Sequence, residues 1–296
     1  MALIGLCLPL TACQANKRPV DVILMAGQSN MVGCSRVTYL NNSVGMVKYQ
    51  EYVSGYNGIR IAYDNLTKEA LDVYPEQNTS NGNFVKVMLG EGNADITFGP
   101  EVGMAEVLSQ TPHNDNLFLI KYACGASNLL DDWAAPSSGR ISGLYAGFVS
   151  YVHAQMKALE ESGFAPTIKA MLWMQGEGDS YPGYAEQYLS QLSYFVGDLR
   201  AELMEYCEGT EFAFIDAGIS DSPLWAEYAT VNAAKEQFAA QSERNIYIDT
   251  IAEGLITSEE PPEEPDRAHY DSSSMIELGH LFAEAVSSFL SAVEIE

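Results

Sequence analysis

Basic residues, cysteines and long apolar stretches are all scarce in this sequence. Its 296 residues include 15 Lys and Arg against 40 Asp and Glu, which gives a formal net charge of -25 at pH 7. Nucleic acids and anionic membrane surfaces carry charge of the same sign and are repelled by such a protein. We therefore exclude both as partners and expect neutral substrates.

The cysteines do not form the pattern of a disulfide framework or of a zinc site. They stand at Cys7, Cys13, Cys34, Cys124 and Cys207, and none has the Cys-x-x-Cys spacing of a zinc site. Cys34 and Cys124 both follow predicted strand ends, so a pair between them is one alternative to two buried thiols, the interpretation we favour. We expect no metal and no cofactor.

The apolar segment from Ala2 to Cys13 is too short to cross a bilayer as a stable helix. It is typical of a signal-peptide core, although the charged residues that usually precede such a core are missing. Leu10-Thr11-Ala12-Cys13 resembles a bacterial lipobox, in which the cysteine is lipidated. We expect residues 1–19 to be a leader and tether, and the protein to be an exported cell-envelope lipoprotein whose lipid on Cys13 is its only membrane contact. An ordinary apolar N-terminus is the alternative.

The chain turns abruptly from apolar to polar at Gly27. Residues 20–26 form a short run with β-branched members, which predicts a parallel strand buried on both faces, and Gln28-Ser29-Asn30 follow it. Ligands bind beyond the carboxyl ends of the strands in open α/β sheets, so the Ser29 hydroxyl is expected at a crevice. Ser29 is our candidate nucleophile. The alternative is that it only caps the next helix.

Two later stretches supply the groups that a serine nucleophile needs. Near the C-terminus, Asp266 stands three residues before His269. His269 can take the serine proton, and a carboxylate can hold the imidazole in the required tautomer. In the middle of the chain, an apolar run over residues 168–174 ends in the polar turn Gln175-Gly176-Glu177-Gly178-Asp179. We expect the three segments to meet at one crevice.

These motifs together resemble the sialic acid-specific acetylesterase family of SGNH/GDSL-like hydrolases, which includes acetylxylan esterases. The stretches that carry the resemblance are Gly27-Gln28-Ser29-Asn30-Met31, Phe98-Gly99-Pro100-Glu101, Ala123-Cys124-Gly125-Ala126-Ser127-Asn128-Leu129, Trp173-Met174-Gln175-Gly176-Glu177-Gly178-Asp179 and Asp266-Arg267-Ala268-His269. The resemblance extends from Val20 to the C-terminus. We therefore expect one esterase domain over residues 20–296.

The resemblance implies a role for each residue of these motifs. Ser29 is the expected nucleophile, His269 the general base and Asp266 its partner. The Ser29 backbone N–H, Gly125 and the Gln175 side chain are expected to donate hydrogen bonds to the oxyanion. The substrate-binding group also includes Gln28, Asn30 and Glu177, of which Glu177 either assists His269 or only orders the turn.

Two positions depart from the family pattern. Ala126 stands where the family usually has a second glycine, and it is strained if that position needs a positive φ. Gly178 stands where a serine or another small residue is common, a change that we expect to matter little.

The rest of the sequence predicts a flavodoxin-like, doubly wound α/β fold in three α/β/α layers. A mainly parallel, five-stranded sheet is expected near residues 20–27, 117–122, 168–174, 211–216 and 245–249, with helices between the strands. Residues 35–96 are irregular, and we interpret them as a long insertion that borders the crevice. Their tyrosines are candidates for a sugar-binding surface.

The expected function is that of a serine carbohydrate esterase, which removes O-acetyl groups from sugars through an acyl-serine intermediate. Acetylated xylan or hemicellulose and O-acetyl sialic acid are the candidate substrates. An inactive carbohydrate-binding protein on the same fold and a lipid-directed SGNH esterase or thioesterase are the alternatives. The acidic, proline-containing run at residues 259–265 leads into Asp266. One interpretation is a solvated loop; the alternative hypothesis is that its carboxylates raise the pKa of His269.

Overall fold

The computed structural model describes residues 17–69, 73–111 and 117–290. The lipidation site expected at Cys13 lies outside these ranges. Within them, no helix combines the length and the apolar composition that crossing a membrane requires. Cys34, Cys124 and Cys207 are free thiols, so the alternative of a Cys34–Cys124 pair is wrong.

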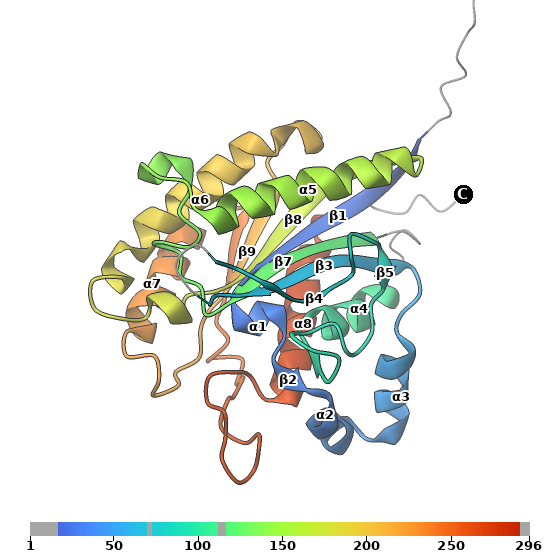
Figure 1. Cartoon of the computed structure of the whole chain (residues 1–296), viewed down its shortest axis with the longest axis vertical. Helices are drawn as coiled ribbons and strands as arrows, with labels where there is room; N and C mark the ends of the chain where they lie inside the picture. Colours follow the sequence, from blue (N-terminus) through green and yellow to red (C-terminus); the bar gives the residue numbers. More distant parts are fainter. Residues whose placement is uncertain (1–16, 70–72, 112–116, 291–296) are drawn as a thin grey trace, which may run out of the picture.

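A mainly parallel sheet runs through the centre of the molecule (Figure 1). Its strands lie in the order β10-β9-β8-β1-β7-β3-β4, and β5 pairs with β3. Their bounds are β1 Arg18–Gly27, β3 Ile59–Thr67, β4 Glu76–Thr79, β5 Val85–Lys86, β7 Leu117–Gly125, β8 Phe164–Met174, β9 Ala213–Ala217 and β10 Asn245–Ile248. β4 and β5 are antiparallel to β3. The other neighbouring strands of this sheet, in the order β3-β7-β1-β8-β9-β10, pair in parallel. A separate antiparallel pair joins β2 (Ser35–Arg36) to β6 (Thr97–Phe98).

Helices cover both faces of this sheet, which confirms the predicted three layers. In Figure 1, α5 and α6 lie in front of the sheet, whereas α4 and α8 lie behind it and pack against each other. The helix bounds are α1 Ser29–Val32, α2 Val37–Val44, α3 Met46–Ser54, α4 Glu101–Ser109, α5 Gly143–Glu161, α6 Tyr188–Glu202, α7 Tyr228–Ala239 and α8 Ser272–Ser287. Short 3-10 helices are η1 Pro136–Ser138, η2 Glu177–Asp179, η3 Ala185–Gln187 and η4 Met204–Tyr206.

The five predicted strands are confirmed as β1, β7, β8, β9 and β10. A further parallel strand, β3, pairs with β7 and belongs to the segment that we interpreted as an insertion, so residues 35–96 are in part core structure. The polar residues Asp64 and Asn65 interrupt the apolar pattern of this strand, so the sequence does not predict it. Asn65 is nevertheless fully buried, because its Nδ2 donates to the carbonyl oxygens of Glu91 at 2.9 Å and Gly92 at 2.8 Å.

The sheet brings the carboxyl ends of three strands together. β1 lies between β7 and β8, and its residues 22–26 are completely buried, which explains their uninterrupted apolar character. In the sheet register, Gly27 lies opposite Ala123 of β7 and Met174 of β8. The polar turns that follow these strands therefore meet at one edge, as the sequence predicts for a crevice.

Candidate active site

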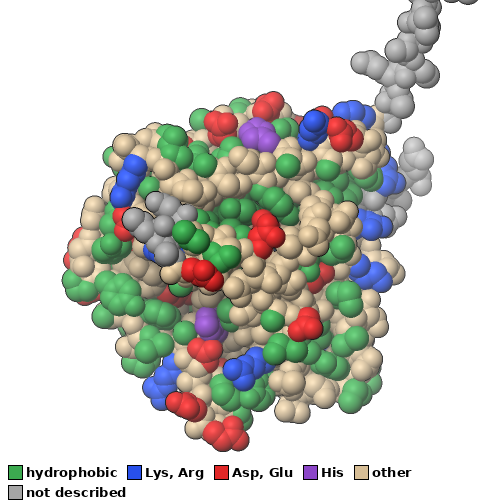
Figure 2. All heavy atoms as spheres, viewed as in Figure 1, with side chains coloured by type: hydrophobic (Ala, Val, Ile, Leu, Met, Phe, Trp, Pro, Cys, Tyr) green, Lys and Arg blue, Asp and Glu red, His purple; other side chains and the backbone are tan. Residues whose placement is uncertain are grey.

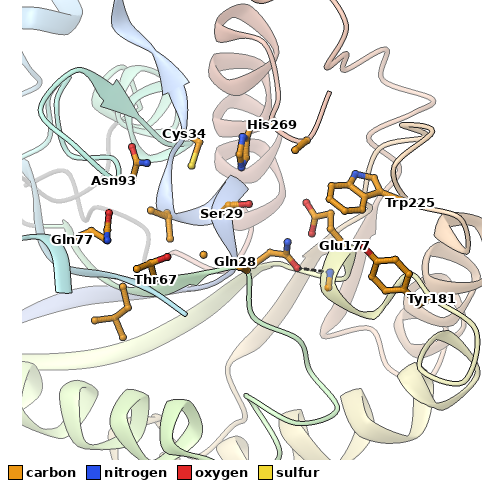
Figure 3. Close-up of a pocket in the computed structure, with 16 residues that line it drawn as sticks. Gln28, Ser29, Cys34, Thr67, Gln77, Asn93, Glu177, Tyr181, Trp225 and His269 are labelled. Atoms are coloured by element: carbon orange, nitrogen blue, oxygen red, sulfur yellow. Dashed lines mark hydrogen bonds between the residues drawn. The ribbon is translucent and has the colours of Figure 1, made fainter. Parts of the chain in front are cut away.

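A cavity of about 500 Å³ opens where these turns meet. Its lining includes five of the predicted site residues, namely Gln28, Ser29, Gly125, Glu177 and His269. Asn30, Gln175 and Asp266 do not line it, although each contacts a residue that does. Figure 3 shows Ser29 and His269 next to one another in this cavity, with Gln28 and Glu177 close to Ser29.

Ser29 is placed by the turn that ends β1. Gln28, in an extended conformation, donates its backbone N–H to the Met174 carbonyl at 2.9 Å and thereby fixes the turn to β8. Ser29 is then the first residue of α1, and no side chain caps this helix by a hydrogen bond. The alternative in which Ser29 serves only as a helix cap is therefore not what the geometry shows.

His269 is oriented by Asp266, as the spacing predicts. The two residues are joined by Nδ1 of His269 and Oδ2 of Asp266, which are 2.8 Å apart. Burial disfavours the imidazolium, but hydrogen bonds with Asp266 and with the Cys34 thiol outweigh it and raise the pKa of His269 to about 10. The hydrogen bond to His269 in turn lowers the pKa of Asp266.

The acidic run at residues 259–265 contributes a carboxylate to the start of α8 rather than a main effect on the pKa of His269. The Glu260 carboxylate accepts hydrogen bonds from the Ser272 backbone N–H at 2.8 Å and from its hydroxyl at 2.7 Å, at the start of α8. Asp266 and Cys34, rather than this run, are the groups that raise the pKa of His269 most. Cys34 was proposed from the sequence only as a buried thiol, and its contact with the histidine is a structural finding.

Asn30 connects the segments that carry the nucleophile, the base and Glu177. Its Nδ2 donates to Glu177 Oε1 at 2.7 Å, and its Oδ1 accepts from the Tyr270 backbone N–H at 3.1 Å. The Asn30 side chain is 1% exposed and faces the protein rather than the cavity. Its geometry suits positioning of the histidine loop better than the predicted contact with substrate.

The sequence predicts the Gln175 side chain as an oxyanion donor at the cavity, but in the structure Gln28 lines the cavity and Gln175 does not. Gln175 is fully buried, its Nε2 lies 2.6 Å from Asp179 Oδ2, and its Oε1 accepts from the Tyr188 hydroxyl at 3.0 Å. Gln28 Oε1 accepts from Gln175 Nε2 at 3.2 Å and from the Gly178 N–H at 3.0 Å. The Gln28 Nε2, which has no acceptor among the described residues, is directed toward Ser29 in Figure 3.

The loop after β7 brings Gly125 and Ala126 to the cavity. Ala126 has a φ of 60°, so this position does require the left-handed conformation and the alanine is strained there. Asp179 holds the following part of the loop, because its carboxylate accepts from the N–H groups of Leu129 at 2.7 Å and Leu130 at 3.1 Å. Burial raises the pKa of Asp179 to about 6 against the effect of these bonds.

Gly178 matters more than the sequence suggests. A Cβ atom at this position would lie 2.3 Å from the Ser127 carbonyl oxygen, because the loop after β7 passes directly over it. The expectation that this departure from the family pattern has little consequence is therefore wrong. In this chain, a glycine is needed for the two turns to pack.

Glu177 lines the cavity with a carboxyl group that is only half satisfied. Glu177 is 1% exposed, its Oε1 accepts from Asn30, and its Oε2 has no hydrogen-bond partner among the described residues. Burial raises the pKa of Glu177. Several lining residues were not identified from the sequence: Thr67, Gln77, Asn93, Tyr181 and Trp225. Thr67 ends β3 and Gln77 lies on β4, the other three lie outside helices and strands, and no sequence motif marks any of the five.

Comparisons with known proteins agree with this geometry. The family model described as carbohydrate esterase, sialic acid-specific acetylesterase matches residues 19–288. A comparison with curated protein sequences finds no match. Among solved structures, a protein from Arabidopsis thaliana is similar with a TM-score of 0.57 at 20% identity, over 92% of this chain and 99% of the other.

Two further structures have the same fold. NanS is similar with a TM-score of 0.59 at 14% identity, over 93% of this chain and 98% of the other. A carbohydrate acetylesterase from Xanthomonas citri is similar with a TM-score of 0.57 at 15% identity, over 91% of this chain and 56% of the other. The family model covers nearly the whole chain, and the predicted resemblance is confirmed. The chain belongs to the sialic acid-specific acetylesterase family of carbohydrate esterases, and it is a carboxylic ester hydrolase that removes O-acetyl groups from sugars.

Proposed function

We propose that Ser29, His269 and Asp266 perform this hydrolysis through an acyl-serine intermediate. The observation that carries the proposal is the shared cavity wall of Ser29 and His269, together with the 2.8 Å contact between His269 Nδ1 and Asp266 Oδ2. A carboxylate on Nδ1 fixes the tautomer in which Nε2 acts as the base. This pairing supports the proposal, because it leaves Nε2 of His269 available to take the Ser29 proton.

The reaction follows from these positions in two steps. His269 takes the Ser29 proton as the serine oxygen attacks the acetyl carbonyl, and it then gives that proton to the departing sugar hydroxyl. In the second step, His269 takes a proton from water as the water oxygen attacks the acyl carbon, and it returns that proton to Ser29 Oγ as the bond from Oγ to the acyl carbon breaks and acetate leaves. Asp266 stabilises the imidazolium in both steps.

Hydrogen-bond donors around Ser29 stabilise the oxyanion in this mechanism. We assign this role to the Gln28 Nε2 and to the Ser29 backbone N–H, with Gly125 at the same cavity wall. Helix-initial N–H groups have no acceptor within their own helix, so the Ser29 N–H is suited to this use. One well-placed donor contributes roughly 3 kcal/mol to lowering the barrier. Gln175 supports this arrangement indirectly, because it holds the Gln28 side chain by a 3.2 Å contact.

Acetate release is the direct test of the proposal. Wild type and Ser29→Ala are compared on acetylated xylan, on O-acetyl sialic acid and on 4-nitrophenyl acetate. We expect wild type to release acetate from at least one sugar substrate and Ser29→Ala to lose nearly all activity. A wild type that binds sugar but hydrolyses none of the three substrates would support the inactive binding protein instead.

We also propose that the protein is exported and lipidated at Cys13. Support comes from the sequence Leu10-Thr11-Ala12-Cys13 and from a substrate class that is largely found outside cells. Detergent phase partitioning of the native protein is the measurement. Wild type is expected in the detergent phase and Cys13→Ala in the aqueous phase, whereas an aqueous wild type that starts at Met1 contradicts lipidation.

A further inference from the structure

No Lys or Arg side chain lines the cavity that holds Ser29, and the one cationic group that does, the imidazole of His269, is paired with Asp266. Every one of the 15 Lys and Arg falls within the described ranges, and none of them lines this cavity. On the face shown in Figure 2, Lys and Arg side chains lie mostly toward the edge. Resting on the proposed function, we infer that the enzyme deacetylates uncharged sugars and discriminates against sugars that carry a carboxylate, such as sialic acids.

Arg267 directly precedes the lining residues Ala268 and His269, but its side chain is exposed and is not part of the lining. Three further cations near the site lie or pair elsewhere. Lys68 follows the lining residue Thr67, but its Nζ lies 2.7 Å from Asp132 Oδ2. Lys235 is fully buried, with its Nζ 2.5 Å from Asp216 Oδ1. Arg36 lines a different, smaller cavity together with Asp266, and its charge helps to lower the pKa of that carboxyl. None of these groups is placed to pair with a substrate carboxylate at Ser29.

Apart from Glu177 and His269, the polar side chains that line the cavity are neutral hydrogen-bonding and aromatic groups. Thr67, Gln77 and Asn93 lie on one side of Ser29 in Figure 3, and Tyr181 and Trp225 lie on the other. Amides and hydroxyls match the hydroxyl groups of a sugar, and aromatic faces match its C–H surfaces. The only carboxyl group in the described lining is that of Glu177, whose negative form would repel a second carboxylate.

A sialic acid carboxylate would therefore enter this cavity at a cost. Sialic acids are ionised at neutral pH, and an ion that leaves water needs a partner of opposite charge or several hydrogen bonds in return. The net charge of -25 adds a long-range repulsion that salt screens. A neutral acetylated sugar, such as a xylose unit of hemicellulose, meets neither penalty.

The test uses two substrates that differ in the charge of one carboxyl group and in the methyl group that removes this charge. Acetate release is measured from O-acetyl N-acetylneuraminic acid and from the methyl ester of its carboxyl group, with acetylated xylo-oligosaccharides as the neutral reference. We expect kcat/KM to be at least tenfold higher for the ester than for the free acid. We expect the ratio of the two values to decrease as the salt concentration is raised. A free acid that is hydrolysed as well as its ester, or better, overturns the inference.

Failure of the proposed function would look different. If Ser29→Ala retained the activity of wild type on 4-nitrophenyl acetate, the assignment of the nucleophile would fail whatever the preference between the two sialic acid substrates. The charge inference is judged by the ratio of the two kcat/KM values and not by their absolute size.

A charge introduced at the rim gives an independent test. Gln77 is an exposed lining residue on β4, so Gln77→Arg puts a cation at the cavity without disturbing the core. We expect this variant to raise the ratio of acid to ester kcat/KM by about tenfold, which corresponds to one favourable ionic contact. Gln77→Met, of similar length but neutral, is the matched control and is expected to leave the ratio unchanged. Equal effects of both variants on the ratio would contradict the role of charge.

Discussion

His269 is the residue whose environment most directly sets the working pH of the enzyme. Its pKa is raised to about 10, above the ordinary value of 6.5, by Asp266 and by the Cys34 thiol. Only the neutral imidazole can act as the base, so the active form accumulates as the pH rises through this pKa. The acidic limb of kcat/KM is therefore expected above pH 6.5, on the alkaline side of an unperturbed histidine.

Removal of the Cys34 thiol should shift the acidic limb of the pH profile of kcat/KM. Cys34→Ala deletes one of the two groups that raise the pKa of His269, and we expect the acidic limb of kcat/KM to move to lower pH. The measurement is the pH profile of 4-nitrophenyl acetate hydrolysis. Cys207→Ala, which changes a thiol outside the lining, is the control and should leave the limb in place. An identical profile for Cys34→Ala would show that Asp266 alone sets the protonation of His269.

The residues of the proposed triad could be selected from the sequence because their positions are marked locally. Ser29 follows a strand end, and Asp266 stands one short turn before His269, so the sequence itself places these groups. The two glutamines were not distinguishable in this way. Whether a buried amide faces a cavity depends on its neighbours, and Asp179 and Tyr188, which hold Gln175 inward, come together only in the fold.

At the scale of elements, the site depends on how closely the turn after β8 packs against the loop after β7. Gly178 and Ser127 are the contact points, and Gln28 accepts a hydrogen bond from the Gly178 N–H. A displaced turn would also move Glu177 and the Gln28 side chain. Stability and activity are therefore coupled at this position.

Gly178→Ala should be destabilising for this reason. The added Cβ meets a backbone oxygen that cannot rotate away, and overpacking of this kind costs about 1–3 kcal/mol. The free energy of unfolding in denaturant measures the effect, and kcat for acetate release is expected to fall with it. In the control Gly197→Ala, on α6, the Cβ meets nothing within 4 Å, and helix propensity predicts a gain of about 0.5–1 kcal/mol. Equal unfolding free energies for the two variants would contradict this packing argument.

The elements that periodicity and burial define were predicted, and those that depend on specific polar contacts were not. β1 is apolar throughout because it is central in the sheet and buried on both faces. β3 contains Asp64 and Asn65, and only the carbonyl oxygens of Glu91 and Gly92 make the buried Asn65 acceptable. These acceptors lie on a segment whose position no local pattern specifies.

At the scale of the whole molecule, the fold assembles one site from three distant parts of the chain. Asn30 joins these parts by hydrogen bonds: one to Glu177, 147 residues away in the sequence, and one from Tyr270, 240 residues away. The chain has a net charge of -25, and no Lys or Arg lies in the described lining of the site. Composition led to the expectation of a neutral substrate, whereas the residues that line the cavity needed the structure.

The central claim is that Ser29 and His269 act as one catalytic unit. Its most direct test compares kcat for acetate release by Ser29→Ala, His269→Ala and the double variant, with near-wild-type thermal unfolding of all three as the control for folding. We expect each single variant to lose nearly all activity and the double variant to be no worse than the singles, because either change disables the same step. A double variant several orders of magnitude below both singles, or a single variant with near-wild-type kcat, would contradict the account.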